Sequence, residues 1–315
     1  MATYLITGGA GFIGSHLADR LLANGDNVRV LDDLSTGHRH NLAAEAELIV
    51  GSICDPAMIR QAIAGCDGVF HLAAVASVQK SIDCWGETHN VNSQGAVNVF
   101  EAAKDADKLP VVFASSAATY GNNTAIPLSE NEIPQPISFY GADKLANEVH
   151  AGLASLAYGM RFAGMRFFNV YGPRQDPSSP YSGVISIFVN HTLSDRQLQI
   201  FGTGEQTRDF VFVSDVAASL HQAMKYLQNS TQPCFIKSNV CRGQEVSILD
   251  LAREITHLAG KSGDPLFRDA RQGDIMRSKG DPSRLNTEIG HIADVSLQDG
   301  LRALLDWEQA QRAAK

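Results

Sequence analysis

The chain has 315 residues, of which 44% are hydrophobic and 19% charged, values typical of a globular protein with one large or two ordinary domains. A net charge of −8 argues against nucleic acid as a partner. The five cysteines include no C-x-x-C pair, and no apolar run approaches the ~20 residues of a membrane span. We therefore expect a cytoplasmic protein with free thiols, no metal site and no membrane contact.

A glycine-rich turn follows the first predicted strand. Gly8, Gly11 and Gly14 come directly after the apolar run 4–6, at the start of a predicted helix. The apolar residues at helical spacing are Phe12, Ile13, Leu17, Leu21 and Leu22. Glycine permits the turn and a close approach of the backbone, while the free N–H groups of a helix N-terminus bind phosphate. The spacing is G-x-x-G-x-x-G, and no Lys-Ser/Thr pair follows it, so we predict a dinucleotide site rather than a P-loop.

The second predicted strand, residues 27–31, indicates which dinucleotide is bound. It ends in Asp32 and Asp33, about 20 residues past the glycine turn. An acidic side chain at this place accepts hydrogen bonds from the adenosine ribose and repels a 2′-phosphate. We therefore predict NAD, although Arg39 and the neighbouring histidines leave NADP as an alternative.

Strand and helix patterns alternate through the first half of the chain. The predicted strands are 47–51, 68–72, 110–114 and 161–167, and the predicted helices are 56–64, 87–104 and 140–158. This alternation predicts an α/β fold with a doubly wound parallel sheet.

The pattern changes after residue 169, where several prolines and serines predict a long irregular loop. Helices are expected near 216–227 and 248–258. We therefore expect an NAD-binding domain over residues 1–172 and a smaller C-terminal substrate domain over 173–315. Segments near 205–240 could return to the first domain.

A serine, a tyrosine and a lysine form the candidate catalytic group. Tyr140 and Lys144 lie four residues apart, on one face of a predicted helix. A nearby ammonium lowers the pKa of a phenol, so Tyr140 could act as a base or an acid at neutral pH. Ser115 and Ser116 lie at the C-terminal end of a predicted strand, where α/β sites assemble. Either hydroxyl could bind a substrate alcohol or its carbonyl product, or be a turn residue only.

With the glycine turn, these residues make the chain resemble the extended short-chain dehydrogenases/reductases. The similarity is greatest to the UDP-hexose 4-epimerases that act on UDP-glucose or UDP-N-acetylglucosamine, and it covers nearly the whole chain. The longer strings that carry it are H-L-A-A at 71–74, N-V-N-S-Q-G at 90–95, R-F-F-N-V-Y-G-P at 166–173, Q-T-R-D-F-V at 206–211 and R-Q-G-D at 271–274.

The resemblance implies roles for individual residues. The catalytic group would be Ser116, Tyr140 and Lys144. The NAD site would be formed by Gly8, Gly11, Phe12, Ile13, Gly14, Asp32, Ser52, Ile53, Leu72, Ala73, Ala74, Asn92, Tyr140, Lys144 and Phe167. The UDP-sugar site would be formed by Ser116, Tyr140, Asn169, Val184, Phe201, Arg208, Arg271, Asp274 and Ser278. Asn169 would hold the diphosphate side, and the two arginines would clamp the phosphates, a task suited to the guanidinium fork.

Three positions refine what the resemblance implies. Ala117 and Ala118 stand where related 4,6-dehydratases and decarboxylases carry acidic residues, which favours an epimerase, because the same hydride leaves and returns. Ser278 stands where a tyrosine restricts related enzymes to plain hexoses, so we expect room for an N-acetyl group and activity on UDP-GlcNAc/UDP-GalNAc, with UDP-Glc/UDP-Gal tolerated. Ser52 replaces an aspartate that contacts adenine in the family, which puts adenine recognition there in doubt.

Alternatives to the epimerase remain open. They are a dehydratase or decarboxylase, a 4-reductase that consumes its cofactor, and a non-catalytic NAD(P)-sensing regulator, which typically lacks the Tyr or the Lys. The helices 87–104 and 140–158 resemble those that pair in family homodimers. Supply of N-acetylgalactosamine for a polysaccharide is the pathway that the resemblance suggests.

Overall fold

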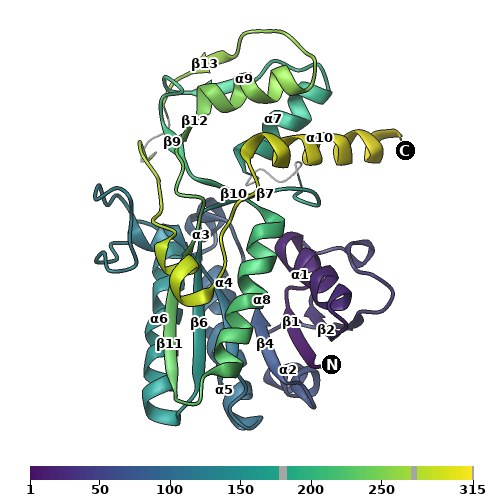
Figure 1. The fold of residues 1–315 in the computed structure, drawn as a ribbon, viewed down its shortest axis with the longest axis vertical. Coiled ribbons are helices and arrows are strands. Elements are labelled where there is room, and N and C mark those ends of the chain that lie inside the picture. Colours follow the sequence, from purple (N-terminus) through teal and green to yellow (C-terminus); the bar gives the residue numbers. More distant parts are fainter. Residues whose placement is uncertain (177–182, 271–274, 314–315) are drawn as a thin grey trace.

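A seven-stranded parallel sheet forms the centre of the larger of two lobes (Figure 1). The computed structural model describes residues 1–176, 183–270 and 275–313. The strands of the sheet are β1 (Thr3–Thr7), β2 (Asn27–Asp32), β3 (Glu47–Val50), β4 (Gly68–His71), β5 (Val111–Ser116), β6 (Arg161–Phe167) and β11 (Cys234–Val240). Their order is β11-β6-β5-β4-β1-β2-β3. The predicted α/β fold with a doubly wound, Rossmann-like sheet is confirmed.

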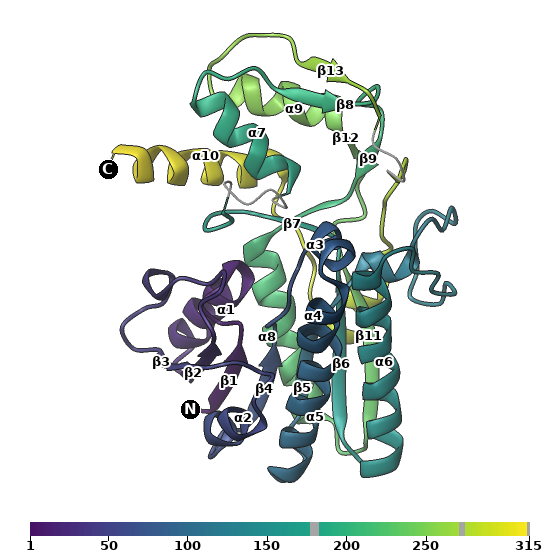
Figure 2. The same cartoon turned by 180° about the vertical axis from the view of Figure 1, so that it is seen from behind.

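Helices cover both faces of this sheet (Figures 1 and 2). One face carries α1 (Phe12–Ala23) and α8 (Val213–Asn229), and the other carries α2 (Pro56–Ile63), α5 (Gly95–Asp105) and α6 (Phe139–Tyr158). Because strand side chains alternate between faces, Tyr4 and Ile6 pack in one core with Leu220 of α8, while Leu5 packs in the other with Val99 of α5. Burial on both faces explains the nearly continuous apolar strands of the sequence.

The predicted helix 87–104 is interrupted. Residues 85–105 form α4 (Trp85–His89), a π-helical turn (Asn90–Gln94) and α5. The side chain of Asn147 on α6 donates to the Asn92 carbonyl at 2.9 Å, so a neighbouring helix satisfies the backbone at the interruption. A shorter helix, α3 (Val78–Asp83), precedes this stretch.

The chain passes between the lobes more than once. After residue 172 it enters the smaller lobe, and it returns as α8 and β11, which packs beside β6 in the sheet. Residues 213–240 therefore lie in the larger lobe. No helix in the described ranges is long and apolar enough to cross a membrane.

The smaller lobe has its own apolar core. Its elements are α7 (Val184–Leu193), β8 (Gln199–Phe201), β9 (Thr207–Arg208), β12 (Val246–Ser247), α9 (Ile248–Leu258), β13 (Leu266–Arg268) and α10 (Leu297–Ala313). Buried leucine, isoleucine and phenylalanine side chains of α7, α9 and α10 fill this core. The parallel pair β7 (Asn169–Tyr171) and β10 (Phe210–Phe212) lies at the junction of the lobes (Figure 1).

Candidate active site

The glycine turn joins the C-terminal end of β1 to α1. Gly8 has φ +71°, and a Cβ atom there would lie 2.6 Å from the backbone nitrogen of Ala73. A Cβ at Gly14 would collide with the Gly8 carbonyl oxygen. No side chain caps the N-terminus of α1 at Gly11, and its first turn carries no acidic residue. The backbone thus forms a tight cradle at the positive end of a helix, which fits a dinucleotide diphosphate.

Asp32 links the end of β2 to this turn. Its carboxylate accepts hydrogen bonds from the backbone nitrogens of Ala10 and Leu34, both at 2.9 Å. Burial raises the pKa of Asp32, and these two N–H groups oppose the rise. The carboxylate therefore lies beside the glycine turn, as its expected role in binding the adenosine ribose requires.

The loop after β4 closes the other side of the turn. Asn92 is 1% exposed, and its side chain accepts from the Val75 nitrogen at 2.8 Å and donates to the Val75 carbonyl at 3.2 Å. Leu72 and Ala73 bond to Thr7 on β1. Asn92 therefore stabilises the loop that carries residues 72–74, next to the glycine turn.

The other residues that were predicted to bind the cofactor lie at the same end of the sheet. Phe12 and Ile13 form the first turn of α1, and Phe167 ends β6. Ile53 is buried after β3, and the Ser52 hydroxyl accepts from the backbone nitrogen of Cys54 at 3.1 Å. Ser52 therefore supports its own loop.

Two neighbouring elements bring the predicted catalytic group together. Ser116 ends β5 and caps the 3-10 turn η3 (Ala117–Tyr120), while Tyr140 lies in the first turn of α6. A Cβ at Gly141 would lie 2.6 Å from the Ala118 carbonyl oxygen, so glycine allows α6 to pack tightly on η3. As a result, the Tyr140 phenol lies close enough to the Ser116 side chain for the two hydroxyls to interact.

The electrostatics of Tyr140 differ from the prediction. Burial raises the pKa of the Tyr140 phenol, and the hydrogen bond with Ser116 opposes the rise. The Lys144 ammonium is 5.7 Å from the centroid of the phenol ring and donates to the Ala114 carbonyl at 2.9 Å. Burial also lowers the pKa of Lys144 to about 8. The expected lowering of the Tyr140 pKa is therefore wrong, because the desolvation of the buried phenol outweighs the effects that favour its ionisation.

A buried polar network supports the strand that carries Ser116. Ser115 donates to Glu148 of α6 at 2.6 Å, and Glu148 binds Arg166 of β6 with both carboxylate oxygens, at 2.8 and 2.6 Å. The Arg166 guanidinium lies 4.7 Å from the ring centroid of Tyr120, whose hydroxyl donates to Asn239. The network thus fixes α6 against β5 and β6.

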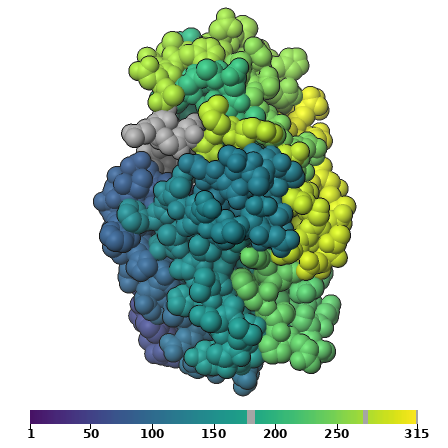
Figure 3. Space-filling view, turned by 90° about the vertical axis from the view of Figure 1, so that its left-hand side faces the viewer, coloured from purple at the N-terminus to yellow at the C-terminus, as the bar shows by residue number. Residues whose placement is uncertain are grey.

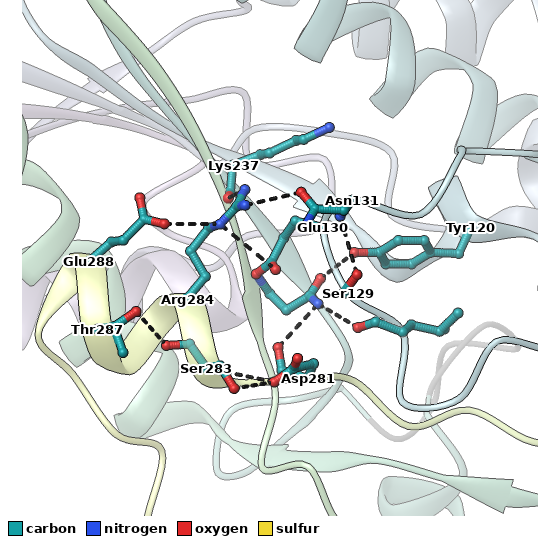
Figure 4. Close-up of polar contacts among 12 residues, drawn as sticks. Tyr120, Ser129, Glu130, Asn131, Lys237, Asp281, Ser283, Arg284, Thr287 and Glu288 are labelled. Carbon is teal, nitrogen blue, oxygen red and sulfur yellow. Dashed lines mark hydrogen bonds and ion pairs between the residues drawn. The ribbon is translucent and has the colours of Figure 1, made fainter.

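Figure 4 shows where this network continues. The Asn239 nitrogen donates to Glu130 at 2.7 Å, and Glu130 forms an ion pair with Arg284 at 4.0 Å. Arg284 also contacts Asn131 and Glu288. The loop before α6 and the segment after residue 280 are therefore held together by hydrogen bonds and ion pairs.

The predicted substrate residues come from several segments near the lobe junction. The Asn169 amide donates to the Asp209 carbonyl at 3.2 Å, and Arg208 donates to the Thr207 and Ile275 carbonyls at 2.8 and 2.6 Å. Val184 begins α7 and Phe201 ends β8. Arg271 and Asp274 lie outside the described residues.

Ser278 is 9% exposed and lies in a well-anchored loop. Leu128 accepts from the Asp281 nitrogen at 2.9 Å and donates to the Lys279 carbonyl at 2.8 Å. Leu128 belongs to a buried cluster with Tyr120 and Phe168. In the sequence, Tyr120 follows Ser116 by four residues, and Phe168 directly precedes Asn169. The Ser278 loop is therefore held against the buried cluster that contains Leu128 and Tyr120.

The sequence interpretation missed Asp209 and Glu148 as contributors to the site. Glu148 follows Lys144 by four residues, as Lys144 follows Tyr140, so helical spacing could have placed all three on one face. Asp209 follows the polar residues 205–208 and precedes the apolar run 210–213, so the sequence gives no signal of its burial.

The fold and the site define the class of the protein. A glycine turn after β1, a serine at the end of β5 and a Tyr-x-x-x-Lys pair on α6 characterise an extended short-chain dehydrogenase/reductase, as predicted. Residues 4–237 match the NAD dependent epimerase/dehydratase family, and the chain belongs to it.

Similar proteins cover almost the full chain. UDP-glucose 4-epimerase of Mycolicibacterium smegmatis is 37% identical over 311 residues, 96% of this chain and 97% of its own. The structure resembles UDP-glucose 4-epimerase from Thermotoga maritima with UDP-glucose (TM-score 0.93, 33% identity, 98% of this chain and 99% of that one). The structure also resembles UDP-N-acetylglucosamine 4-epimerase from Methanobrevibacter ruminantium in complex with UDP-N-acetylmuramic acid, with a TM-score of 0.93 and 33% identity. That match covers 98% of this chain and 99% of the other.

Proposed function

We propose that the protein is an NAD-dependent 4-epimerase of UDP-hexoses, with UDP-GlcNAc and UDP-GalNAc as its main substrates. The observation that carries this proposal is the placement of the Tyr140 phenol beside Ser116, with the Lys144 ammonium 5.7 Å from the centroid of the phenol ring. Ala117 and Ala118 directly follow Ser116. The alanines offer no carboxylic acid for the elimination of water or the relay of a second proton. The full-length similarity to UDP-glucose and UDP-N-acetylglucosamine 4-epimerases supports the same reaction.

The glycine turn, Asp32 and the loop 72–74 would hold the dinucleotide. When bound, NAD⁺ supplies an acceptor for the C4 hydride and a positive charge that favours ionisation of nearby acids. Tyr140, as the phenolate, takes the proton of the sugar 4-hydroxyl at Oη and later returns it, while Ser116 Oγ donates to the oxygen as it becomes a carbonyl. The positive charge of the Lys144 ammonium favours the phenolate form of Tyr140. Arg208 and Asn169 hold the diphosphate, so the hexose can turn and present its other face.

The first experiment uses purified protein without added NAD, incubated with UDP-GlcNAc and, separately, with UDP-Glc. The products are resolved by proton NMR. UDP-GalNAc is the expected product, and its appearance requires a cofactor retained from expression. Product from UDP-Glc alone would keep the epimerase but exclude the N-acetyl substrate. No epimer from either sugar, with or without added NAD, would exclude this function.

Ser278 offers a test of the substrate preference. The Ser278→Tyr variant is expected to lower kcat/KM for UDP-GlcNAc by about 10- to 100-fold, because a bulky side chain fills the space of an N-acetyl group. Its kcat/KM for UDP-Glc is expected to stay within about threefold of the wild type. Ser278→Ala serves as control and should preserve both values. An equal loss for both sugars in Ser278→Tyr would contradict a selective role.

A homodimer is part of this proposal, because α5 and α6 expose an apolar face. Leu153 and Leu156 of α6 are 58% and 87% exposed. Leu153 also lines a groove together with Val97 of α5. Figure 3 looks onto the side of the larger lobe where α6 lies at the surface. An apolar face of this kind fits a second copy of the chain.

The Leu156→Glu variant is expected to dissociate the dimer, because it introduces a charge into an apolar contact. Light scattering after size-exclusion chromatography should change from twice the 33.9 kDa chain mass to a single chain. Phe267→Glu, at a 50% exposed position in β13, is the matched control and should leave the mass unchanged. A dimeric Leu156→Glu protein would exclude this face as the interface.

A further inference from the structure

Asp209 is a fully buried aspartate at the junction of the lobes. It lies between Arg208 of β9 and Phe210 of β10 and is 0% exposed. Its carboxylate accepts from three backbone nitrogens: Arg242 at 2.9 Å, Gly243 at 2.9 Å and Gly280 at 3.2 Å. A buried carboxylate that binds three N–H groups from two other segments is a strong structural constraint, because charged acceptors form the shorter and stronger hydrogen bonds.

The same residue also binds Asn169 through its main chain. The Asp209 carbonyl accepts from the backbone nitrogen of Asn169 at 3.0 Å and from its side-chain amide at 3.2 Å. Asp209 therefore contacts Asn169 directly, adjoins Arg208 in sequence, and holds Gly280, two residues after Ser278. Asn169, Arg208 and Ser278 belong to the set that the proposed function assigns to the nucleotide sugar.

The backbone approaches Asp209 closely at two glycines. Gly243 has φ +70°, a conformation that favours glycine. A Cβ at Gly280 would lie 2.5 Å from the Cys241 sulfur and 2.7 Å from the Phe168 ring, so only glycine fits there without displacement. Burial raises the pKa of Asp209 to about 6, and the three N–H groups and the Arg242 charge oppose the rise.

We propose that Asp209 is the positioning residue that assembles the diphosphate site of the nucleotide sugar from both lobes. Arg208 comes from the smaller lobe, Asn169 from the end of the larger lobe, and residues 242–243 follow β11 of the sheet. A single carboxylate and its adjacent carbonyl fix the distances between these segments. This inference rests on one part of the proposed function, namely that the ligand carries a uridine diphosphate group.

The test measures UDP binding by isothermal titration calorimetry and retained NAD by absorbance after release. Asp209→Asn keeps the size of the side chain but places an NH₂ group against backbone donors. We expect its Kd for UDP to rise at least about tenfold, as the loss of one charged hydrogen bond predicts. Retained NAD and kcat at saturating UDP-sugar should stay within about threefold of the wild type, because neither the glycine turn nor the Tyr140 region contacts Asp209.

Asp215→Asn is the matched control. Asp215 is also buried, at 5% exposure, and its carboxylate accepts a backbone N–H, from Val295 at 3.0 Å, but it binds none of the proposed substrate segments. This variant should lose stability without a change in UDP affinity. Gly280→Ala provides a second route, because the added methyl group displaces the Gly280 nitrogen while Asp209 stays intact, and it should weaken UDP binding as Asp209→Asn does.

The outcomes separate the two proposals. Unchanged UDP affinity in folded Asp209→Asn, or an equal loss in Asp215→Asn, overturns the positioning role and leaves the epimerase proposal standing. If Asp209→Asn does not fold, unchanged UDP affinity in Gly280→Ala overturns the role instead. A wild-type protein that does not bind UDP overturns both proposals.

Discussion

Tyr140→Phe is expected to lower kcat for epimerisation by about 10²- to 10⁴-fold, the usual contribution of a positioned acid–base group. The variant removes only the hydroxyl that contacts Ser116, so the packing of α6 on η3 should persist. Tyr140 is only partly exposed, and burial raises the pKa of its phenol. Turnover is measured with UDP-GlcNAc and UDP-Glc under saturating conditions.

The control for this variant is Tyr158→Phe, at the other end of the same helix. Tyr158 is 52% exposed, so loss of its hydroxyl should leave kcat unchanged. Retained NAD and the circular dichroism spectrum should match the wild type in both variants. Near-normal turnover of Tyr140→Phe would exclude Tyr140 as the acid–base residue and, with it, the proposed mechanism.

Glu148→Ala is expected to reduce the free energy of unfolding by about 3–5 kcal/mol, because it leaves a buried arginine without its partner. Arg166 is 0% exposed, and its two hydrogen bonds to Glu148 are short, at 2.8 and 2.6 Å. Ser115, next to Ser116, loses its acceptor as well. Urea denaturation followed by fluorescence measures the change.

Two further variants separate loss of the ion pair from other effects. Lys261→Ala removes a surface ion pair to Asp195, and it should cost less than about 1 kcal/mol. The double variant Glu148→Met and Arg166→Met should recover part of the lost stability, because no charge then remains buried. If Glu148→Ala unfolds at the same urea concentration as the wild type, the buried pair does not stabilise α6 against the sheet.

Much of the site can be read from local sequence because its residues lie at element ends. The apolar runs and glycines around residues 4–14 define a strand, a turn and a helix by short-range rules of conformation. The structure has these elements, with Ser116 at the end of β5 and both Tyr140 and Lys144 on α6. Helical spacing was sufficient to place Tyr140 and Lys144 on one face, because four residues nearly complete one turn.

Other features depend on residues far apart in the chain, and local patterns carry no information about them. The direction of the Tyr140 pKa depends on how deeply neighbouring segments bury the phenol, and the ammonium that was expected to lower it bonds to Ala114 of a neighbouring strand. The helix interruption at Asn92 depends on a side chain 55 positions later. Asp209 binds segments 33 and 71 residues away.

The sequence by itself thus determined the fold class, the glycine turn after the first strand and the placement of Tyr140 and Lys144 on one helix face, since each follows from backbone propensity and periodicity within a few residues. The choice of Ser116 over Ser115 came from the family resemblance. The tertiary structure decided the protonation preferences, the return of α8 and β11 to the sheet, and the convergence of backbone N–H groups on Asp209. The physical reason is that desolvation and buried hydrogen bonding arise only when distant segments exclude water from a common space.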